Sequence, residues 1–138
     1  MTKKYLYIPE INSELNGLTK SELRTYILDY YKQNLKGIEV VNNDTGITIR
    51  FSMTSGRKTA MGEAMYQRKA EIIRTLPELV KYALYNNFGH PKETDSPEII
   101  GYLNFKGRCV IDGKLKMSEL LYNFKNKPSF ITILKLTP

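Results

Sequence analysis

The sequence predicts an α+β domain, in which an antiparallel sheet of about four to six strands carries helices mainly on one face. Helical patterns cover residues 19–36 and 60–84, and β-favouring runs separated by turn residues dominate residues 98–136. The chain lacks both the strand-helix-strand alternation of a doubly wound parallel sheet and its Gly-x-Gly-x-x-Gly sequence. An antiparallel arrangement is therefore the expectation.

The size and charge of the chain limit what it can be. Its 138 residues predict a single domain over 1–138, and 41% hydrophobic residues are enough for a core. A formal charge of +7 favours polyanionic partners, of which RNA or another nucleic acid is the first candidate. An acidic protein is the other partner that this charge suits.

Membranes, metals and cofactors receive no support from the sequence. No run approaches the ~20 apolar residues that cross a bilayer, and no signal peptide is recognisable, so we expect a cytoplasmic protein with no membrane partner. Cys109 is the only cysteine, which excludes an internal disulfide and a thiolate zinc cluster. We expect no metal and no cofactor, and Cys109 is expected to pack as a small apolar residue.

The first helix has clear signals at both ends. The sequence Thr19-Lys20-Ser21-Glu22 is a capping box, which satisfies free amides at a helix start. Apolar residues then recur at helical spacing as far as Leu35, and Gly37 is a typical stop. The run 5–8 before this helix is strand-like.

A hairpin and two further helices follow. Residues 38–41 and 47–52 are β-favouring runs separated by turn residues, and we predict a polar loop after them in which Gly56 turns the backbone sharply. Residues 60–74 form a helical pattern. A second capping box, Thr75-Leu76-Pro77-Glu78, predicts a break and a new helix through Leu84, followed by a loop over 86–97.

The last third of the chain predicts a meander. Strands are expected over 98–105, 108–112, 114–124 and 130–136, with turns at Lys106-Gly107, Asp112-Gly113 and 126–128. Asp112-Gly113 is the clearest hairpin turn. Residues 117–121 could instead form a helical turn.

The segment after the strand 47–52 is the main candidate site. Arg57 and Lys58, with the hydroxyls of Ser55 and Thr59, could hold a phosphate, and Arg50 would add a contact from the polar face of the strand. The alternative is an ordinary solvated loop, because Ser, Gly, Arg and Lys are common loop residues.

Four segments carry a family resemblance: residues 40–52, Gly56-Arg57-Lys58-Thr59, residues 76–80 and Val110-Ile111-Asp112-Gly113-Lys114. In their order the chain resembles the large polyvalent protein-associated domains of mobile elements, in the branch with a barnase, EndoU, colicin and RelE-like fold. The resemblance implies helices packed on an antiparallel sheet and relatives that include RNases. Its basic loop would correspond to Arg57 and Lys58, without the histidine that many such RNases use.

RNA cleavage needs a proton acceptor, a proton donor and cations for the charge on phosphorus. With a single histidine, a two-histidine mechanism is impossible. We therefore assign phosphate stabilisation to Arg57 and Lys58, and proton transfer to Tyr66 or Lys69, in a metal-independent ribonuclease. The alternatives are that Tyr66 is a packing residue and Lys69 a solvated one.

Two further residues have open interpretations. Arg108 could join a nucleic-acid-binding surface, or it could guard an edge strand against association. His90 suits a simple turn.

Three functions remain open from the sequence. The chain could be an RNA-binding and possibly RNA-cleaving domain of a mobile element. It could also be a noncatalytic module that binds nucleic acid or protein, or a basic host-defence antagonist that recognises an acidic protein. The oligomeric state is not predicted.

Overall fold

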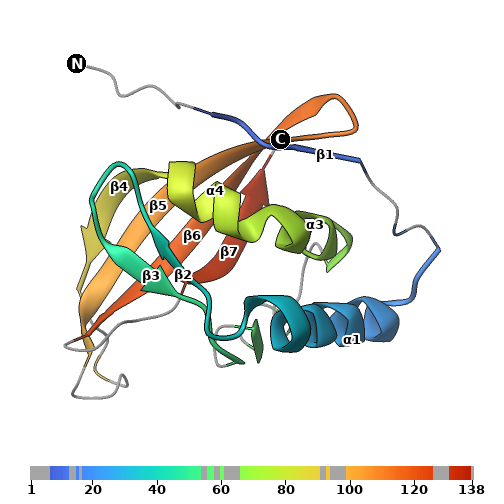
Figure 1. Ribbon diagram of the computed structural model, residues 1–138, viewed down its shortest axis with the longest axis horizontal. Helices are drawn as coiled ribbons and strands as arrows, with labels where there is room; N and C mark the ends of the chain where they lie inside the picture. The colour runs from blue at the N-terminus through green and yellow to red at the C-terminus, as the bar shows by residue number, and fades with distance from the viewer. Residues whose placement is uncertain are drawn as a thin grey trace.

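The computed structural model describes residues 7–12, 15, 17–53, 56–57, 60, 66–90, 93, 99–125 and 131–137. Its helices lie in front of a large sheet in Figure 1. The elements are β1 (Glu10–Ile11), α1 (Lys20–Tyr30), the π-helical turn η1 (Tyr31–Leu35), β2 (Glu39–Val41), β3 (Thr48–Arg50), α3 (Tyr66–Ile72), the 3-10 turn η2 (Ile73–Thr75), α4 (Leu76–Tyr82), β4 (Leu84–Gly89), β5 (Ile99–Ile111), β6 (Lys114–Lys125) and β7 (Ile131–Thr137). The prediction of an α+β fold is confirmed.

The first helix begins and ends as predicted. The Glu22 amide donates to the Thr19 hydroxyl at 3.2 Å, and the Thr19 amide donates to the Glu22 carboxylate at 3.1 Å. Hydrogen bonding to the Glu22 carboxylate, first by the Thr19 amide and then by the Thr19 side chain, holds its pKa below the usual value. The helix continues through η1 and stops at Gly37, whose positive φ of 85° suits glycine.

Within the described residues, the large sheet has five strands. β6 pairs along one edge of β5, and β7 pairs with β6. The other edge of β5 is shared, because β4 pairs antiparallel with its first half and β1 pairs parallel with Val110 and Ile111. The sheet is therefore mixed, since β1 runs parallel to its neighbour.

β5 is a continuous strand through Lys106 and Gly107, so the turn predicted there is wrong. A Cβ at Gly107 would lie 2.7 Å from Cδ1 of Leu79, so glycine lets α4 pack closely on the sheet with Leu79 in its present position. The turn at Asp112 and Gly113 is confirmed, with φ of 50° and 79°. Residues 117–121 belong to β6 and are not helical.

The helical region divides at Thr75, as predicted, but not through a capping box. The Thr75 side chain makes no capping hydrogen bond, and the chain passes through η2 into α4, with Pro77 in the first turn. The predicted extension of the helix to Leu84 is also wrong. Leu84–Gly89 is the strand β4, where a loop was expected from residue 86, because β5 offers it an unpaired edge.

β2 and β3 form the predicted hairpin, which is a separate two-stranded ribbon. The turn between them binds the end of α4: Asn42 Nδ2 donates to the carbonyls of Val80 and Ala83 at 2.8 and 2.9 Å. The Asn42 Oδ1 atom accepts from the amide and the hydroxyl of Thr45, both at 2.9 Å. Asn42 is fully buried. Its side chain supplies donors to carbonyls at the end of α4, which have no partner within the helix.

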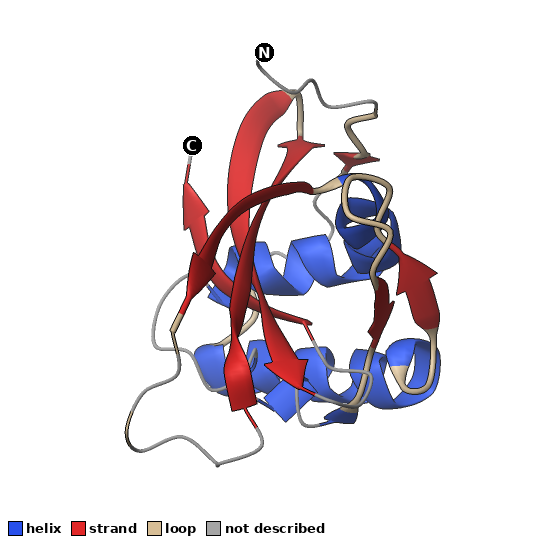
Figure 2. Ribbon diagram, turned by 90° about the vertical axis from the view of Figure 1, so that its left-hand side faces the viewer, coloured by secondary structure: helices blue, strands red, loops and turns tan. Residues whose placement is uncertain are grey.

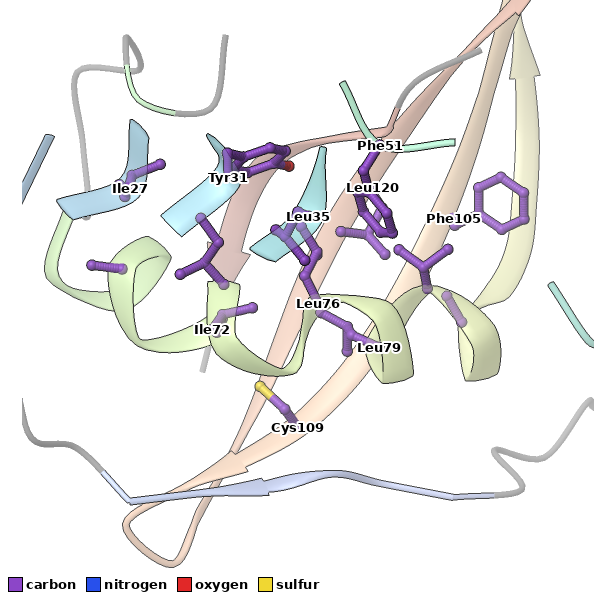
Figure 3. Packing of buried hydrophobic residues seen from close by; sticks show 14 of the residues in the cluster. Ile27, Tyr31, Leu35, Phe51, Ile72, Leu76, Leu79, Phe105, Cys109 and Leu120 are labelled. Carbon is purple, nitrogen blue, oxygen red and sulfur yellow. The ribbon is translucent and has the colours of Figure 1, made fainter. Parts of the chain in front are cut away.

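One hydrophobic core joins the helices, the ribbon and the inner face of the sheet. Figure 3 shows Leu76 and Leu79 of α4 among the core residues, together with Phe105, Cys109 and Leu120 of the sheet and, at the other end of the cluster, Ile27 of α1. Cys109 is buried there as predicted. In Figure 2 the strands of the large sheet lie on one side and the ribbon on the other, with helices between and below them. Helices on one face of the sheet are thus confirmed.

Candidate nucleic-acid interface

The two faces of β5 differ sharply. Its alternate residues Leu103, Phe105, Gly107, Cys109 and Ile111 are buried toward the helices. The residues between them are partly exposed and face the other side: Tyr102, Asn104, Lys106, Arg108 and Val110. We call Tyr102, Asn104, Lys106 and Arg108, with Met117, Glu119 and Leu121 opposite them on β6, the open face. No helix of the described part of the chain is on this side.

Cross-strand neighbours set the charge of the open face. Arg108 lies opposite Met117, and Lys106 lies opposite Glu119. The register then places Lys135 of β7 across from Glu119. Directly opposed residues have Cβ atoms about 5 Å apart, so Glu119 faces Lys106, and the set Lys106, Arg108 and Glu119 keeps a positive excess.

Polar and aromatic groups accompany these cations. Asn104 Nδ2 donates to Oδ1 of Asn87 on β4 at 2.7 Å, which fixes the orientation of both side chains. Tyr102 precedes Asn104 on the same face, beside Gly89 of β4. A sheet surface with cations, an aromatic ring and amides has the group types that contact phosphates and unpaired bases.

On the edge of β5 away from β6, β4 pairs with residues 102–106 and β1 with Val110 and Ile111. Arg108 lies between these two partners, so both interpretations of this residue stay predictions. Sequence reasoning identified Arg108 but missed Lys106, Tyr102 and Asn104. The alternation of buried and partly exposed positions along β5 could have identified these three residues. The apparent turn at Lys106-Gly107 interrupted that pattern in the sequence.

The other predicted cations lie on the side of the sheet that carries the helices. Arg50 is exposed on the outer surface of the ribbon, directly opposite Glu39 of β2. Arg57 is also exposed. Arg50 and Arg57 are therefore separated from Arg108 by the sheet and its core, and the three residues do not form one site.

The segment that was expected to be a loop is helical where it is described, at Met53, Gly56 and Arg57, and Ala60 is helical as predicted. The Gly56 amide donates to the carbonyl of Ser52 at 3.1 Å. Gly56 does not turn the chain: a Cβ there would lie 2.7 Å from Cγ of Tyr31, so glycine lets the backbone contact that ring. Ser55, Lys58 and Thr59 lie outside the described residues.

The predicted proton-transfer residues belong to α3. The side chain of Tyr66 is not described. Lys69 is only 5% exposed and Glu71 only 1%, in a helix that contacts α1 and β7. Lys69 is therefore not the solvated residue that was the alternative to catalysis, and its chemical role stays a prediction.

Among the described residues, no group of three or more His, Cys, Asp or Glu side chains could hold a metal ion. His90 is exposed, and its ring packs edge-on against the ring of Phe88, with 5.5 Å between the two ring centroids. In the part of the chain that is described, no helix is long and apolar enough to span a membrane.

Comparison with known proteins gives one match. No curated protein and no solved structure matches the chain significantly. The model of the family called large polyvalent protein-associated domain 3 matches residues 19–125, which include every element from α1 to β6. Because this match covers most of the chain, the protein belongs to the large polyvalent protein-associated domain 3 family of mobile elements.

Proposed function

We propose that this domain binds single-stranded nucleic acid, with RNA as the first candidate, through the open face. The observation that carries the proposal is the placement of Lys106 and Arg108 two residues apart on one strand, on the same surface as Tyr102 and Asn104. The two cations would neutralise phosphates, while Tyr102 would stack on a base. The amide of Asn104 would contact a base edge.

A second set of cations extends the proposal to the other side of the molecule. Arg50 and Arg57 are exposed there, and with Lys58, Ser55 and Thr59 they would hold a phosphate, as the sequence predicts. RNA cleavage is the enzymatic form of this proposal, with Tyr66 or Lys69 moving the proton. The noncatalytic form needs only binding, and it includes a host-defence antagonist that binds an acidic protein.

We also propose that the fold belongs to the barnase, EndoU, colicin and RelE-like group. Two features support this assignment. α1, α3 and α4 precede the long antiparallel strands β5, β6 and β7 in the chain, and the helices lie against one face of the sheet (Figure 1). Fold likeness does not determine activity, so catalysis must be tested by itself.

The binding test is a salt series. A fluorescent single-stranded 20-nucleotide RNA is titrated with the protein at several salt concentrations, and anisotropy gives the slope of log affinity against log salt. If Lys106 and Arg108 each contact a phosphate, the Lys106→Ala, Arg108→Ala double variant should lower that slope by about 1.4, at ~0.7 for each contact. The Arg50→Ala, Arg57→Ala variant measures the second set in the same way.

A matched control separates contact from overall charge. Lys32 and Lys36 are exposed near the end of the first helix, and replacing both by Ala gives the same formal charge, +7 minus 2, as the double variant of the open face. The control should keep the slope of the original protein. The proposal fails if RNA does not bind at low salt, or if the control lowers the slope as much as the open-face variant.

RNA cleavage is tested with the same protein and with variants of it. RNA of mixed sequence is incubated with a high concentration of protein, and the product ends are sequenced. Intact RNA rejects the enzymatic form, whereas cleavage that is lost in Arg57→Ala or Lys69→Met supports it.

A further inference from the structure

One edge of the ribbon has free backbone groups. The Asn42 amide donates to the carbonyl of Ile47 and the Phe51 amide donates to that of Ile38, both at 2.9 Å. Hydrogen-bonded and non-hydrogen-bonded pairs alternate along an antiparallel ladder, so Glu39 and Val41 direct their N–H and C=O groups away from β3. Within the described residues, no hydrogen bond uses these groups.

A groove lies along this edge, between β2 and α4. Its volume is about 410 Å³, and it is lined by Glu39, Val40, Val41, Asn43, Pro77, Glu78 and Lys81. This volume is within the range of ~300–1,000 Å³ that is usual for ligand sites. Val41 is 53% exposed, so it offers apolar surface at the groove. An unpaired strand edge beside an apolar surface is a template for strand addition.

The charge of the groove is opposite to that of the whole chain. Two carboxylates, Glu39 and Glu78, and one ammonium group, that of Lys81, line it, in a chain of formal charge +7. Lys81 also lies over the ring of Tyr82, with Nζ 5.3 Å from its centroid. The groove therefore disfavours a polyanion and suits a partner that carries a cation beside apolar groups.

We propose that this groove binds an extended peptide segment of a partner protein, which adds to β2 as an antiparallel strand. The residues opposite Val41 and Glu39 would exchange backbone hydrogen bonds with them, and their side chains would lie on the outer surface of the ribbon. The residue between them would point toward Val40 and Pro77. The preferred segment is therefore apolar-apolar-basic, with Lys or Arg opposite Glu39.

This inference is independent of nucleic-acid binding at the open face. The groove is on the helix side of the sheet, whereas the open face is on the other. Peptide binding should thus persist in the Lys106→Ala, Arg108→Ala variant, so failure of one proposal leaves the other standing.

The first test uses a fluorescein-labelled peptide, Thr-Thr-Val-Val-Lys-Thr-Thr, titrated with the full chain and followed by anisotropy. Saturable binding is expected, with about tenfold weaker binding of the version that carries Glu in place of Lys. Glu39→Lys should reverse this preference. The proposal is overturned if binding does not saturate, or if the affinity is the same for the Lys and Glu peptides in both the original protein and Glu39→Lys.

Methylation of single peptide amides tests the backbone contacts without altering the protein. In the proposed register, the amides of the peptide residues opposite Val41 and Glu39 donate to β2, whereas the amide of the residue opposite Val40 points away. N-methylation of either donating amide should weaken binding by about tenfold, and N-methylation of the middle one should leave it nearly unchanged. Equal losses at all three positions overturn strand addition.

Two proline variants examine the two edges of the ribbon. Val41→Pro removes an outward N–H on the groove side, and Thr48→Pro removes the corresponding one on the opposite edge, since the two residues face each other. Only Val41→Pro should abolish peptide binding. Equal effects in two variants that retain the circular dichroism of the original protein overturn the proposal. So does a stable dimer that the peptide does not dissociate, because a second copy then occupies the edge.

Discussion

Asn42 donates a hydrogen bond of 2.8 Å from its side-chain amide to the carbonyl of Val80, across 38 positions of sequence. The turn that contains Asn42 belongs to one of the segments in which the chain resembles its family. Asn42 holds the end of α4, Thr45 orients the Asn42 side chain, and Asp44 accepts from the Tyr85 amide of β4 at 2.9 Å. This part of the family pattern therefore has a structural explanation and needs no ligand.

Replacement of Asn42 should be strongly destabilising. Asn42→Ala leaves the carbonyls of Val80 and Ala83 without their buried donor, and we expect a loss of ~3 kcal/mol in the free energy of unfolding. Urea denaturation measures this loss. The neighbouring Asn43 is exposed and uses its backbone amide, which donates to the Lys81 carbonyl, so Asn43→Ala is the control and should change little. Similar losses in both variants would contradict the explanation.

A side chain at position 107 should disturb the contact between α4 and the sheet. In Gly107→Ala the new Cβ would lie 2.7 Å from Cδ1 of Leu79, and we expect a loss of ~1–3 kcal/mol in unfolding free energy. Leu79→Ala removes the contacting atoms, so in the double variant the two losses should not add. In Gly89→Ala the nearest atom would be 3.7 Å away, and this control should be mild. Additive losses at 79 and 107 would count against the packing argument.

Stability should decline at alkaline pH partly through Tyr30. Burial raises the pKa of its hydroxyl above the usual 10.0, Tyr26 raises it further, and Arg74 opposes both. The folded chain thus holds this proton more tightly than the unfolded chain. Its contribution to stability is fully present below the unfolded pKa and is lost as pH rises through the folded one. Melting temperatures from about pH 8 to about pH 11 should fall less steeply in Tyr30→Phe, and parallel curves would refute this.

Tyr102 and Lys106 should affect RNA binding in different ways. Tyr102→Leu removes a stacking surface without a change of charge, so affinity should fall by ~1–3 kcal/mol while the salt slope stays constant. Lys106→Ala should instead reduce the slope by about 0.7. Tyr7 is 49% exposed and packs at a tilted angle against the ring of Tyr82 of α4, on the other side of the sheet, so Tyr7→Leu is the control. A change of slope in Tyr102→Leu would contradict a stacking role.

The sequence patterns correctly predicted the helix ends and turns that depend on interactions between residues close together in the chain. The capping box at Thr19, the stop at Gly37 and the turn at Asp112 were all readable, because each depends on residues a few positions apart. Gly107 was misinterpreted because the reason for it is Leu79, which lies far away in sequence. β4 was missed because its two asparagines disfavour a strand, and only pairing with β5 stabilises it.

The candidate site was predicted less well than the fold. Arg108 was identified as a possible contact, but its neighbour on the open face, Lys106, was assigned to a turn. That Arg50 and Arg57 lie apart from Arg108 depends on which sheet, and which face of it, each residue occupies. One sequence does not contain that information, since the relation between strands far apart depends on the whole fold.

The pairing of β1 with β5 has a consequence for synthesis on the ribosome. Glu10 lies beside Val110, so the first strand emerges 100 residues before its partner. At the usual pace of translation that delay is about 5–20 s, during which β1 has no strand to join. The β5–β6 hairpin closes through the adjacent turn at Asp112 and can form early, whereas docking of β1 must be among the last folding events. Newly made chains should therefore pass through a state in which the edge of β5 beside Val110 is transiently open to chaperones or to other nascent chains.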